Sequence, residues 1–218
     1  MATSRSAAAA PLEVACAGVL FDLDGVLVDS LPAVERVWGA WARERGLDPD
    51  RVVAMAHGHP SLDTIRALLP GADAVALNRE IERRESADTG GIVPLPGARE
   101  QLQALPPERW AIVTACTRPL AEARIRAAGL PWPAQLVTSD DGARSKPAPD
   151  PYQLGAARLG LAPQACLVVE DRQPGVVAGK AAGARVLGLT TSLTAQQLLA
   201  AGADWIASDC RGFRARLP

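Results

Sequence analysis

Short, continuously apolar runs recur along the chain, and each is followed by a segment with a helical pattern. Five such runs lie at residues 16–23, 110–115, 134–139, 165–171 and 184–190, with a weaker sixth at 203–208. Unbroken apolarity, rather than alternation with polar residues, is typical of strands covered on both faces, as in a parallel sheet. The helical patterns lie at residues 118–129, 150–160, 174–183 and 194–201. The sequence therefore predicts an α/β fold with a doubly wound parallel, Rossmann-like sheet, in which the weaker run is an edge strand.

Residues 31–95 interrupt this alternation, because they carry helical patterns only. Pro32 suits the first turn of a helix and Gly46 suits a helix end. Trp38 and Trp41 are three residues apart and are expected to pack together inside this helical segment. A Gly- and Pro-rich stretch at 90–98 then returns the chain to the sheet.

The predicted domain organisation follows from this interruption. We expect a flexible N-terminal tail over residues 1–15, a Rossmann-like core over 16–30 and 96–218, and an inserted helical cap over 31–95. An insertion after the first strand lies above the carboxyl end of the sheet, where open α/β proteins bind ligands.

Charge and cysteine content exclude several classes of function. Lys and Arg number 23 against 24 Asp and Glu, and no basic stripe is visible, so neither nucleic acid nor a membrane surface is expected as a partner. The N-terminal stretch lacks the apolar core of a secretory signal, and no run approaches the ~18 apolar residues of a membrane helix. The four cysteines are far apart without metal-ligand spacing, which favours reduced thiols in a cytoplasmic protein.

Acidic side chains gather at two predicted strand ends. Asp22 and Asp24 end the first strand, and Glu170 and Asp171 end another. Residues two apart in an extended chain point to the same side, so their carboxylates repel unless a cation or a shared proton intervenes. Such a cluster of hard oxygen ligands suits Mg²⁺. The alternative is a strand followed by a solvated Asp-Gly turn.

Thr114 and Lys146 follow two further strands and complete a candidate anion site. The hydroxyl of Thr114 and the next backbone N–H groups are suited to an anion, and Lys146 can pair with a carboxylate and with a phosphate oxygen. If each residue is considered alone, Thr114 can equally be an ordinary threonine at a strand end, and Lys146 an ordinary surface lysine. Cys116 lies nearby, but the two histidines, His57 and His59, lie in the helical segment, which disfavours a Cys–His mechanism and serine-hydrolase chemistry.

Four stretches together resemble a known family. They are "FDLDGVLVDS", "IVTACT", "SKPAPDPY" and "VVEDRQPGVVAGKAAGARVLGL". In order and spacing they are similar to the four motifs of the haloacid dehalogenase-like hydrolase superfamily, and the helical insert resembles that family's small helical cap. The chain looks most like the branch of sugar-phosphate phosphatases and β-phosphoglucomutase-like proteins.

The resemblance implies a role for each motif residue. Asp22 would be the nucleophile that becomes an aspartyl phosphate, and Asp24 would be the general acid and then the base. Thr114, the backbone of Ala115 and Lys146 would hold the phosphoryl oxygens. The Mg²⁺ site would be formed by Asp22, the backbone carbonyl of Asp24, and Asp171 with Glu170 nearby. Asp29 has a weaker claim and is expected to be a hydrogen-bonding support at the start of the linker to the cap.

The resemblance also suggests specificity residues and contains departures from the family pattern. His57, Gly58, His59 and Ser61 in the cap are expected to face substrate hydroxyls, with an ordinary helix N-cap as the alternative reading for Ser61. Arg172 stands where this branch usually has serine or alanine. Val34 stands where the mutase-like branch has a histidine, which favours water as the phosphoryl acceptor.

We therefore expect a Mg²⁺-dependent phosphomonoesterase that hydrolyses a small sugar or polyol phosphate through an aspartyl phosphate. The alternatives are a phosphosugar mutase of the β-phosphoglucomutase type and a non-catalytic binding member of the family. The expected partner is a small-molecule phosphate ester, and the expected assembly is a monomer or a weak dimer.

Overall fold

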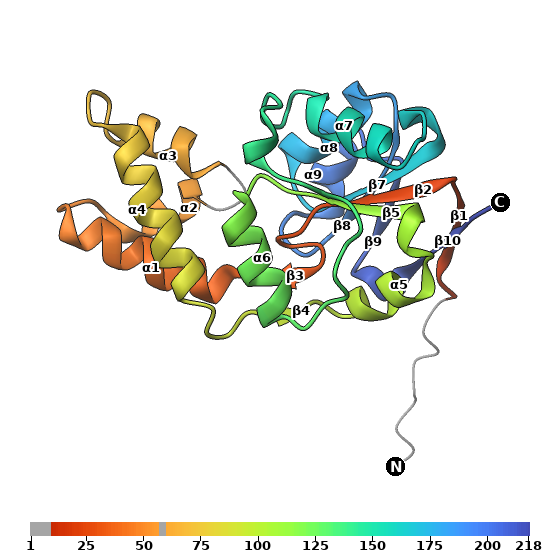
Figure 1. The fold of residues 1–218 in the computed structure, drawn as a ribbon, viewed down its shortest axis with the longest axis horizontal. Helices are drawn as coiled ribbons and strands as arrows, with labels where there is room; N and C mark the ends of the chain where they lie inside the picture. Colours follow the sequence, from red (N-terminus) through yellow and green to blue (C-terminus); the bar gives the residue numbers. More distant parts are fainter. Residues whose placement is uncertain (1–9, 57–59) are drawn as a thin grey trace, which may run out of the picture.

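A computed structural model describes residues 10–56 and 60–218, and within them six parallel strands form the central sheet (Figure 1). Their spatial order is β6 (Leu136–Val137), β5 (Trp110–Val113), β2 (Gly18–Phe21), β7 (Cys166–Glu170), β8 (Arg185–Leu189) and β9 (Trp205–Ala207). Along the chain, β5 and β6 are added on one side of β2, and β7, β8 and β9 are then added on its other side. Ligands bind at such a reversal, outside the carboxyl ends of the strands. The predicted fold class is confirmed, and β9 is the edge strand that its weaker apolar pattern predicted.

Helices cover both faces of this sheet. One face packs against α5 (Ala98–Ala104) and α6 (Arg118–Ala127), and the other against α7 (Asp150–Arg158), α8 (Gln173–Ala181) and α9 (Ala195–Ala200). Because strand side chains alternate, Val19 and Phe21 of β2 enter the first layer and Leu20 enters the second. Both layers are apolar, which explains why the strands read as continuous apolar runs. In the described part of the chain, four short 3₁₀ helices complete the connections, at Pro107–Arg109, Ser139–Asp141, Pro163–Ala165 and Cys210–Gly212.

Between β2 and α5, the described residues form a separate group of helices. These are α1 (Leu31–Glu44), α2 (Pro49–Ala56), α3 (Ser61–Leu68) and α4 (Ala74–Ala87), which we call the helical unit. A short antiparallel pair, β3 (Val28–Asp29) and β4 (Val93–Pro94), flanks it. The unit has its own apolar core, and its helix α4 packs against α6 of the sheet layers. As expected, the rings of Trp38 and Trp41 meet edge to face, with centroids 5.6 Å apart.

A second parallel strand pair corrects one expectation. The sequence predicts a flexible tail over residues 1–15, but Leu12–Ala15 form β1, which pairs with β10 (Phe213–Arg216). The backbone hydrogen bonds of this pair and the burial of Val14, which is 2% exposed, order the segment. Because the two strands are about 200 residues apart in the sequence, no local sequence pattern predicts their pairing. Residues 1–9 of the predicted tail lie outside the described residues.

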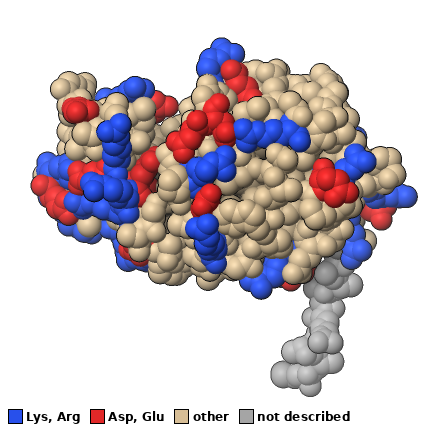
Figure 2. All heavy atoms as spheres, viewed as in Figure 1, with Lys and Arg blue, Asp and Glu red and all other residues tan. Residues whose placement is uncertain are grey.

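The surface carries charges of both signs. On the face drawn in Figure 2, basic and acidic side chains are interspersed, in keeping with a formal net charge of −1. None of the helices in the described part of the chain has the length and apolarity needed to cross a membrane.

Replacement of Trp41 by alanine tests the independent core of the helical unit. Trp41 is fully buried, so Trp41→Ala is expected to lower the free energy of unfolding by about 3–5 kcal/mol through lost burial and a residual cavity. The matched control is Trp132→Ala, since Trp132 is 52% exposed and should contribute at most about 1 kcal/mol. Urea unfolding followed by circular dichroism measures both, and equal losses would contradict this account of the core.

Candidate active site

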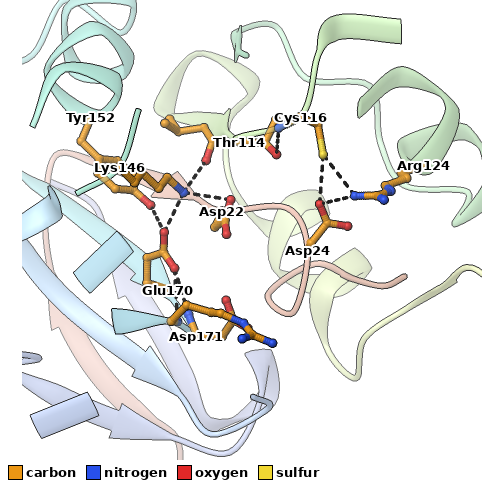
Figure 3. Close-up of polar contacts among 11 residues, drawn as sticks. Asp22, Asp24, Thr114, Cys116, Arg124, Lys146, Tyr152, Glu170 and Asp171 are labelled. Atoms are coloured by element: carbon orange, nitrogen blue, oxygen red, sulfur yellow. Dashed lines mark hydrogen bonds and ion pairs between the residues drawn. The ribbon is translucent and has the colours of Figure 1, made fainter. Parts of the chain in front are cut away.

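The carboxyl ends of β2, β5 and β7 and the loop after β6 meet at one cavity (Figure 3). The structure brings most of the predicted motif residues to its lining: Asp22, Asp24, Thr114, Ala115, Lys146 and Glu170. Asp171 follows Glu170 at the end of β7 and lies directly below this lining. The helical unit contributes the opposite wall of the cavity, through residues of α1, α2, α3 and α4.

Asp22 is positioned by a tight turn that follows β2. Its backbone N–H donates to the carbonyl of Val169 at 3.0 Å, which extends the β2–β7 pairing by one residue. The chain then turns at Gly25, which has φ +77°. A Cβ at Gly25 would lie 2.0 Å from Oδ2 of Asp171, so only glycine allows the turn to approach the acidic cluster this closely.

Lys146 is the cation at the centre of the site. Its Nζ lies 3.0 Å from Oδ1 of Asp22 and 2.7 Å from Oε1 of Glu170, and it donates to the carbonyl of Val113 at 3.1 Å. Burial by itself lowers the pKa of Lys146, but Asp22 and Glu170 outweigh burial and raise that pKa above its ordinary value. Lys146 is therefore a fixed positive charge beside Asp22.

Glu170 is held on both carboxylate oxygens by other groups of the protein. Besides Lys146, the Tyr152 hydroxyl donates to Oε1 at 2.5 Å, and the backbone N–H of Asp171 donates to Oε2 at 3.1 Å. A Cβ at Gly175, in α8, would lie 1.7 Å from Oε1 of Glu170, so a glycine is needed for this helix to pass the carboxylate. These contacts make Glu170 a support that aims Lys146 toward Asp22.

The acidic cluster fits a divalent cation. Carboxylate oxygens of Asp22, Glu170 and Asp171 lie within 4.8 Å of one another. Burial, reinforced by its acidic neighbours, raises the pKa of Asp171 well above its usual range. For Asp22, burial and the charges of Glu170 and Asp24 outweigh Lys146 and raise the pKa to about 7. Oδ1 of Asp171 is buried without a hydrogen-bond partner among the described residues, which leaves it available to a hard cation.

The carboxylate of Asp24 is directed away from this cluster. Its Oδ1 accepts from the Ser30 hydroxyl at 2.6 Å, and its Oδ2 accepts from Arg124 Nη1 at 2.7 Å and from the Cys116 thiol at 3.2 Å (Figure 3). Burial opposes ionisation, but Arg124 and these hydrogen bonds outweigh it, so the pKa of Asp24 lies below its usual range. The two aspartates of the first motif are therefore shifted in opposite directions.

Arg124 is a site residue that the sequence analysis missed. It comes from α6, is 5% exposed, and extends its other nitrogen, Nη2, to Oε1 of Glu85 in α4 at 2.8 Å. A buried guanidinium thus joins Asp24 in the core to Glu85 in the helical unit. One sequence signal was present: Arg124 occupies the helix stripe of Leu120, Ala121 and Ile125, which is otherwise apolar and buried.

The residues at the end of β5 lie between the cluster around Lys146 and the pair formed by Asp24 and Arg124 (Figure 3). Thr114 is 4% exposed, and its hydroxyl oxygen accepts from the backbone N–H of Cys116 at 3.1 Å. Burial and the neighbouring Asp24 raise the pKa of the Cys116 thiol well above its ordinary value. A raised pKa disfavours the thiolate, so it agrees with the expectation that Cys116 is not a catalytic nucleophile.

The remaining candidates fall on both sides of the cavity. Ser61 lines it from the helical unit, and Pro60, not Ser61, is at the N-cap of α3. Arg172 lines it from the core, with Nε 3.8 Å from Oδ2 of Asp171. Asp29 accepts a hydrogen bond from the backbone of Leu31 at 3.1 Å, as expected of a support at the linker. His57, Gly58 and His59 lie outside the described residues.

Comparisons with known proteins agree on one family, and two curated relatives are named for the hydrolysis of phosphate esters. A family model for haloacid dehalogenase-like hydrolases matches residues 16–183. Hexitol phosphatase A of Escherichia coli (strain K12) is 50% identical over 177 residues, which are 79% of this chain and 82% of that protein. Glycerol-1-phosphate phosphohydrolase 1 of Saccharomyces cerevisiae is 31% identical over 219 residues, 94% of this chain and 86% of that protein. A solved structure, a hydrolase from Pseudomonas syringae, has a TM-score of 0.79 at 26% identity and covers 89% of this chain and 94% of its own.

Replacement of Arg124 by methionine tests the bridge between Asp24 and Glu85. Arg124→Met leaves the buried carboxylate of Glu85 and the largely buried carboxylate of Asp24 without their cation, so we expect the free energy of unfolding at pH 8 to fall by about 3–5 kcal/mol. Arg126→Met is the matched control on the same helix, since the Arg126 side chain is 64% exposed and its ion pair is expected to contribute under about 1 kcal/mol.

The pH dependence of the same variant distinguishes lost charge from lost packing. Burial already raises the pKa of Glu85, and without Arg124 the native state would bind more protons than the unfolded chain above the unfolded pKa. The unfolding free energy of Arg124→Met should therefore rise as the pH falls from 8 to 5, relative to the wild type. Denaturant unfolding at both values measures this, and a pH-independent loss would contradict the ionic account.

Proposed function

Because the chain belongs to the haloacid dehalogenase-like hydrolase family, we propose that it is a phosphomonoesterase that hydrolyses a small sugar or polyol phosphate in the cytoplasm. The similarity to proteins named for hexitol phosphate and glycerol phosphate hydrolysis supports this substrate class. The described cysteines, Cys16, Cys116, Cys166 and Cys210, are free, as suits a reducing compartment.

The observation that carries the proposal is the environment of Asp22. This carboxylate opens onto the cavity, has Lys146 at 3.0 Å, and lies within 4.8 Å of the oxygens of Asp171 and Glu170. A phosphate ester in the cavity would meet a carboxylate nucleophile with a fixed cation beside it. Phosphoryl transfer depends mainly on such positioning and on charge neutralisation.

The first step transfers the phosphoryl group to the protein. A carboxylate oxygen of Asp22 attacks phosphorus, the new O–P bond forms, and the bond from phosphorus to the ester oxygen breaks. Lys146 and Thr114, with the backbone N–H of Ala115, hold the phosphoryl oxygens in this proposal. Asp24, in its protonated form, gives its proton to the leaving alcohol oxygen.

The second step releases the phosphate. Asp24, now a carboxylate, takes a proton from a water molecule, whose oxygen attacks phosphorus and displaces Asp22. The products are inorganic phosphate and the regenerated Asp22 carboxylate. The lowered pKa of Asp24 favours its ionised form, which is the form that this step requires. The first step requires the protonated form, and in this proposal the negative charge of the bound phosphate ester raises the pKa of Asp24 before that step.

We assign the acidic cluster to Mg²⁺. Asp22, Asp171 and the backbone carbonyl of Asp24 would hold the ion, and Glu170 would lie close by. When bound, the ion would neutralise negative charge on the phosphoryl oxygens. Arg172 adds a second cation at the rim of the same cluster.

Hydrolysis is favoured over transfer between two positions of a sugar. Val34 is buried at 5% exposure and lines the cavity at the position where the mutase-like branch has a histidine. A valine has no proton to donate or accept, so this position offers no acid–base group for a second phosphoryl acceptor. Water therefore remains the acceptor in the proposed reaction.

Replacement of the two aspartates tests their separate roles. Asp22→Asn should reduce kcat for p-nitrophenyl phosphate by roughly a thousandfold or more, because the nucleophile is lost. Asp24→Asn should reduce kcat for sorbitol 6-phosphate by about 10²–10⁴-fold, the usual contribution of general acid–base catalysis. Asp50→Asn, on the exposed surface of α2, is the matched control and should retain activity. Turnover by Asp22→Asn at the wild-type rate would refute the proposed nucleophile.

Metal binding can be measured without turnover. Mg²⁺ in excess should raise the melting temperature of the wild type, because a ligand that binds the native state stabilises it by mass action. Asp171→Asn should abolish this rise, and a chelator should reverse it and stop turnover in the wild type. An equal rise in both proteins would contradict the assignment of Asp171.

A further inference from the structure

The helical unit contributes a carboxylate to the cavity that the proposed reaction does not use. We propose that Glu82 of α4 is a specificity residue, which selects phosphate esters of neutral polyhydroxy compounds and rejects those that carry a second anionic group. The inference rests on the proposed phosphomonoesterase function and adds to it the part of the substrate beyond the phosphate.

One face of α4 carries three polar side chains, two of which line the cavity. Asn78, Glu82 and Glu85 follow at intervals of four and three residues, which places them on the same side of the helix. Glu82 and Glu85 both line the cavity that contains Asp22 and Lys146. Their charges also interact, since Glu82 contributes to the raised pKa of Glu85, after the larger effect of burial.

The two glutamates have different partners. Glu85 is paired with Arg124, whose Nη2 lies 2.8 Å from Oε1, so its charge is compensated. Among residues 10–56 and 60–218, no Lys or Arg nitrogen lies within 4.0 Å of the carboxylate oxygens of Glu82. Its hydrogen-bond partner there is the Ser61 hydroxyl, which lies 2.8 Å from Oε1 of Glu82 and 2.6 Å from Oδ1 of Asn78.

This arrangement leaves acceptor capacity for a ligand. The Ser61 hydroxyl has one proton and can serve only one of its two acceptors at a time, whereas an ionised carboxylate has about four acceptor sites. Glu82 can therefore accept hydrogen bonds from the hydroxyl groups of a bound substrate. Ser61, which also lines the cavity, supplies a neighbouring hydroxyl oxygen as a further acceptor.

The walls of the cavity consequently differ in charge. The core wall presents Lys146 and Arg172 to the phosphoryl group, whereas the wall from the helical unit presents the carboxylate of Glu82. A substrate whose distal end carries hydroxyl groups can place its phosphate at the cations of the core wall and donate hydrogen bonds to Glu82. A distal carboxylate or second phosphate would be placed near Glu82, and the resulting like-charge contact reduces binding in a partly buried site.

Two phosphate esters that differ at a single carbon provide the test. Sorbitol 6-phosphate ends in a CH₂OH group where 6-phosphogluconate ends in a carboxylate, while their phosphate ends and chain lengths are the same. The measured quantity is the ratio of kcat/KM for sorbitol 6-phosphate to kcat/KM for 6-phosphogluconate, with Mg²⁺ present. We expect this ratio to be about ten or more for the wild type, because like-charge contacts oppose the acidic ester.

Three variants separate the charge of Glu82 from its shape and from the net charge of the protein. Glu82→Gln removes the charge but retains the size, and it should lower the ratio about tenfold or more. Glu82→Lys should bring the ratio below one. Glu35→Gln makes the same change of net charge on the exposed side of α1, and it should leave the ratio and the activity toward p-nitrophenyl phosphate unchanged.

The outcomes separate this inference from the function on which it rests. Absence of any wild-type turnover of p-nitrophenyl phosphate and of both sugar esters would refute the proposed function itself. Turnover with a wild-type ratio near or below one would refute the role of Glu82 alone. A ratio that stays the same in Glu82→Gln, with both rates lowered equally, would also refute it, because a purely structural role affects both esters alike.

Discussion

The compensation of buried negative charge at the ends of β2 and β7 is the constraint on which the site depends. Asp22, Glu170 and Asp171 bring three carboxylates together, and Lys146 is the cation inserted between two of them. One lysine does not balance three acids, which is why burial and mutual repulsion raise the pKa values of Asp22 and Asp171. The folded protein therefore has a site that a divalent cation would complete.

The ion pair between Asp24 and Arg124 is a second balance of charge, formed separately from that of the acidic cluster. Asp24 is two residues from Asp22, but its carboxylate is engaged by Arg124 and Ser30 instead of the acidic cluster. The pKa of Asp22 is raised to about 7 and that of Asp24 is lowered, so two neighbouring aspartates have distinct electrostatic environments. In the proposed mechanism one of them bonds to phosphorus and the other transfers protons. Different partners allow residues of the same type to perform different tasks.

Local patterns were sufficient to predict the sheet but not the long-range pairings. The main strands were found because both faces of the sheet are covered, which makes each strand apolar throughout. The pairs β1–β10 and β3–β4 were missed because they are short and join segments far apart in the chain. The motif residues were found because Asp22, Lys146 and Asp171 lie at strand ends or in the loop that follows, whereas Arg124 and Glu85 meet across 39 residues from the last turns of two helices. The charge of Arg124 on an otherwise apolar stripe of α6 was the available signal.

The bridge formed by Arg124 connects these separate features. Nη1 of Arg124 forms an ion pair with Asp24, a residue of the proposed chemistry. Nη2 forms a second ion pair with Glu85, which belongs to the helical unit that forms the opposite wall of the cavity. Because all three side chains are buried or nearly so, neither ion pair can be lost without leaving a charge unpaired in a poorly solvated site. The pairing with Glu85 requires α4 to pack against α6, and the same packing places Glu82 in the cavity wall. The position of the helical unit is thus coupled through Arg124 to the environment of Asp24, so the wall facing the substrate and the proposed proton-transfer residue depend on the same contact.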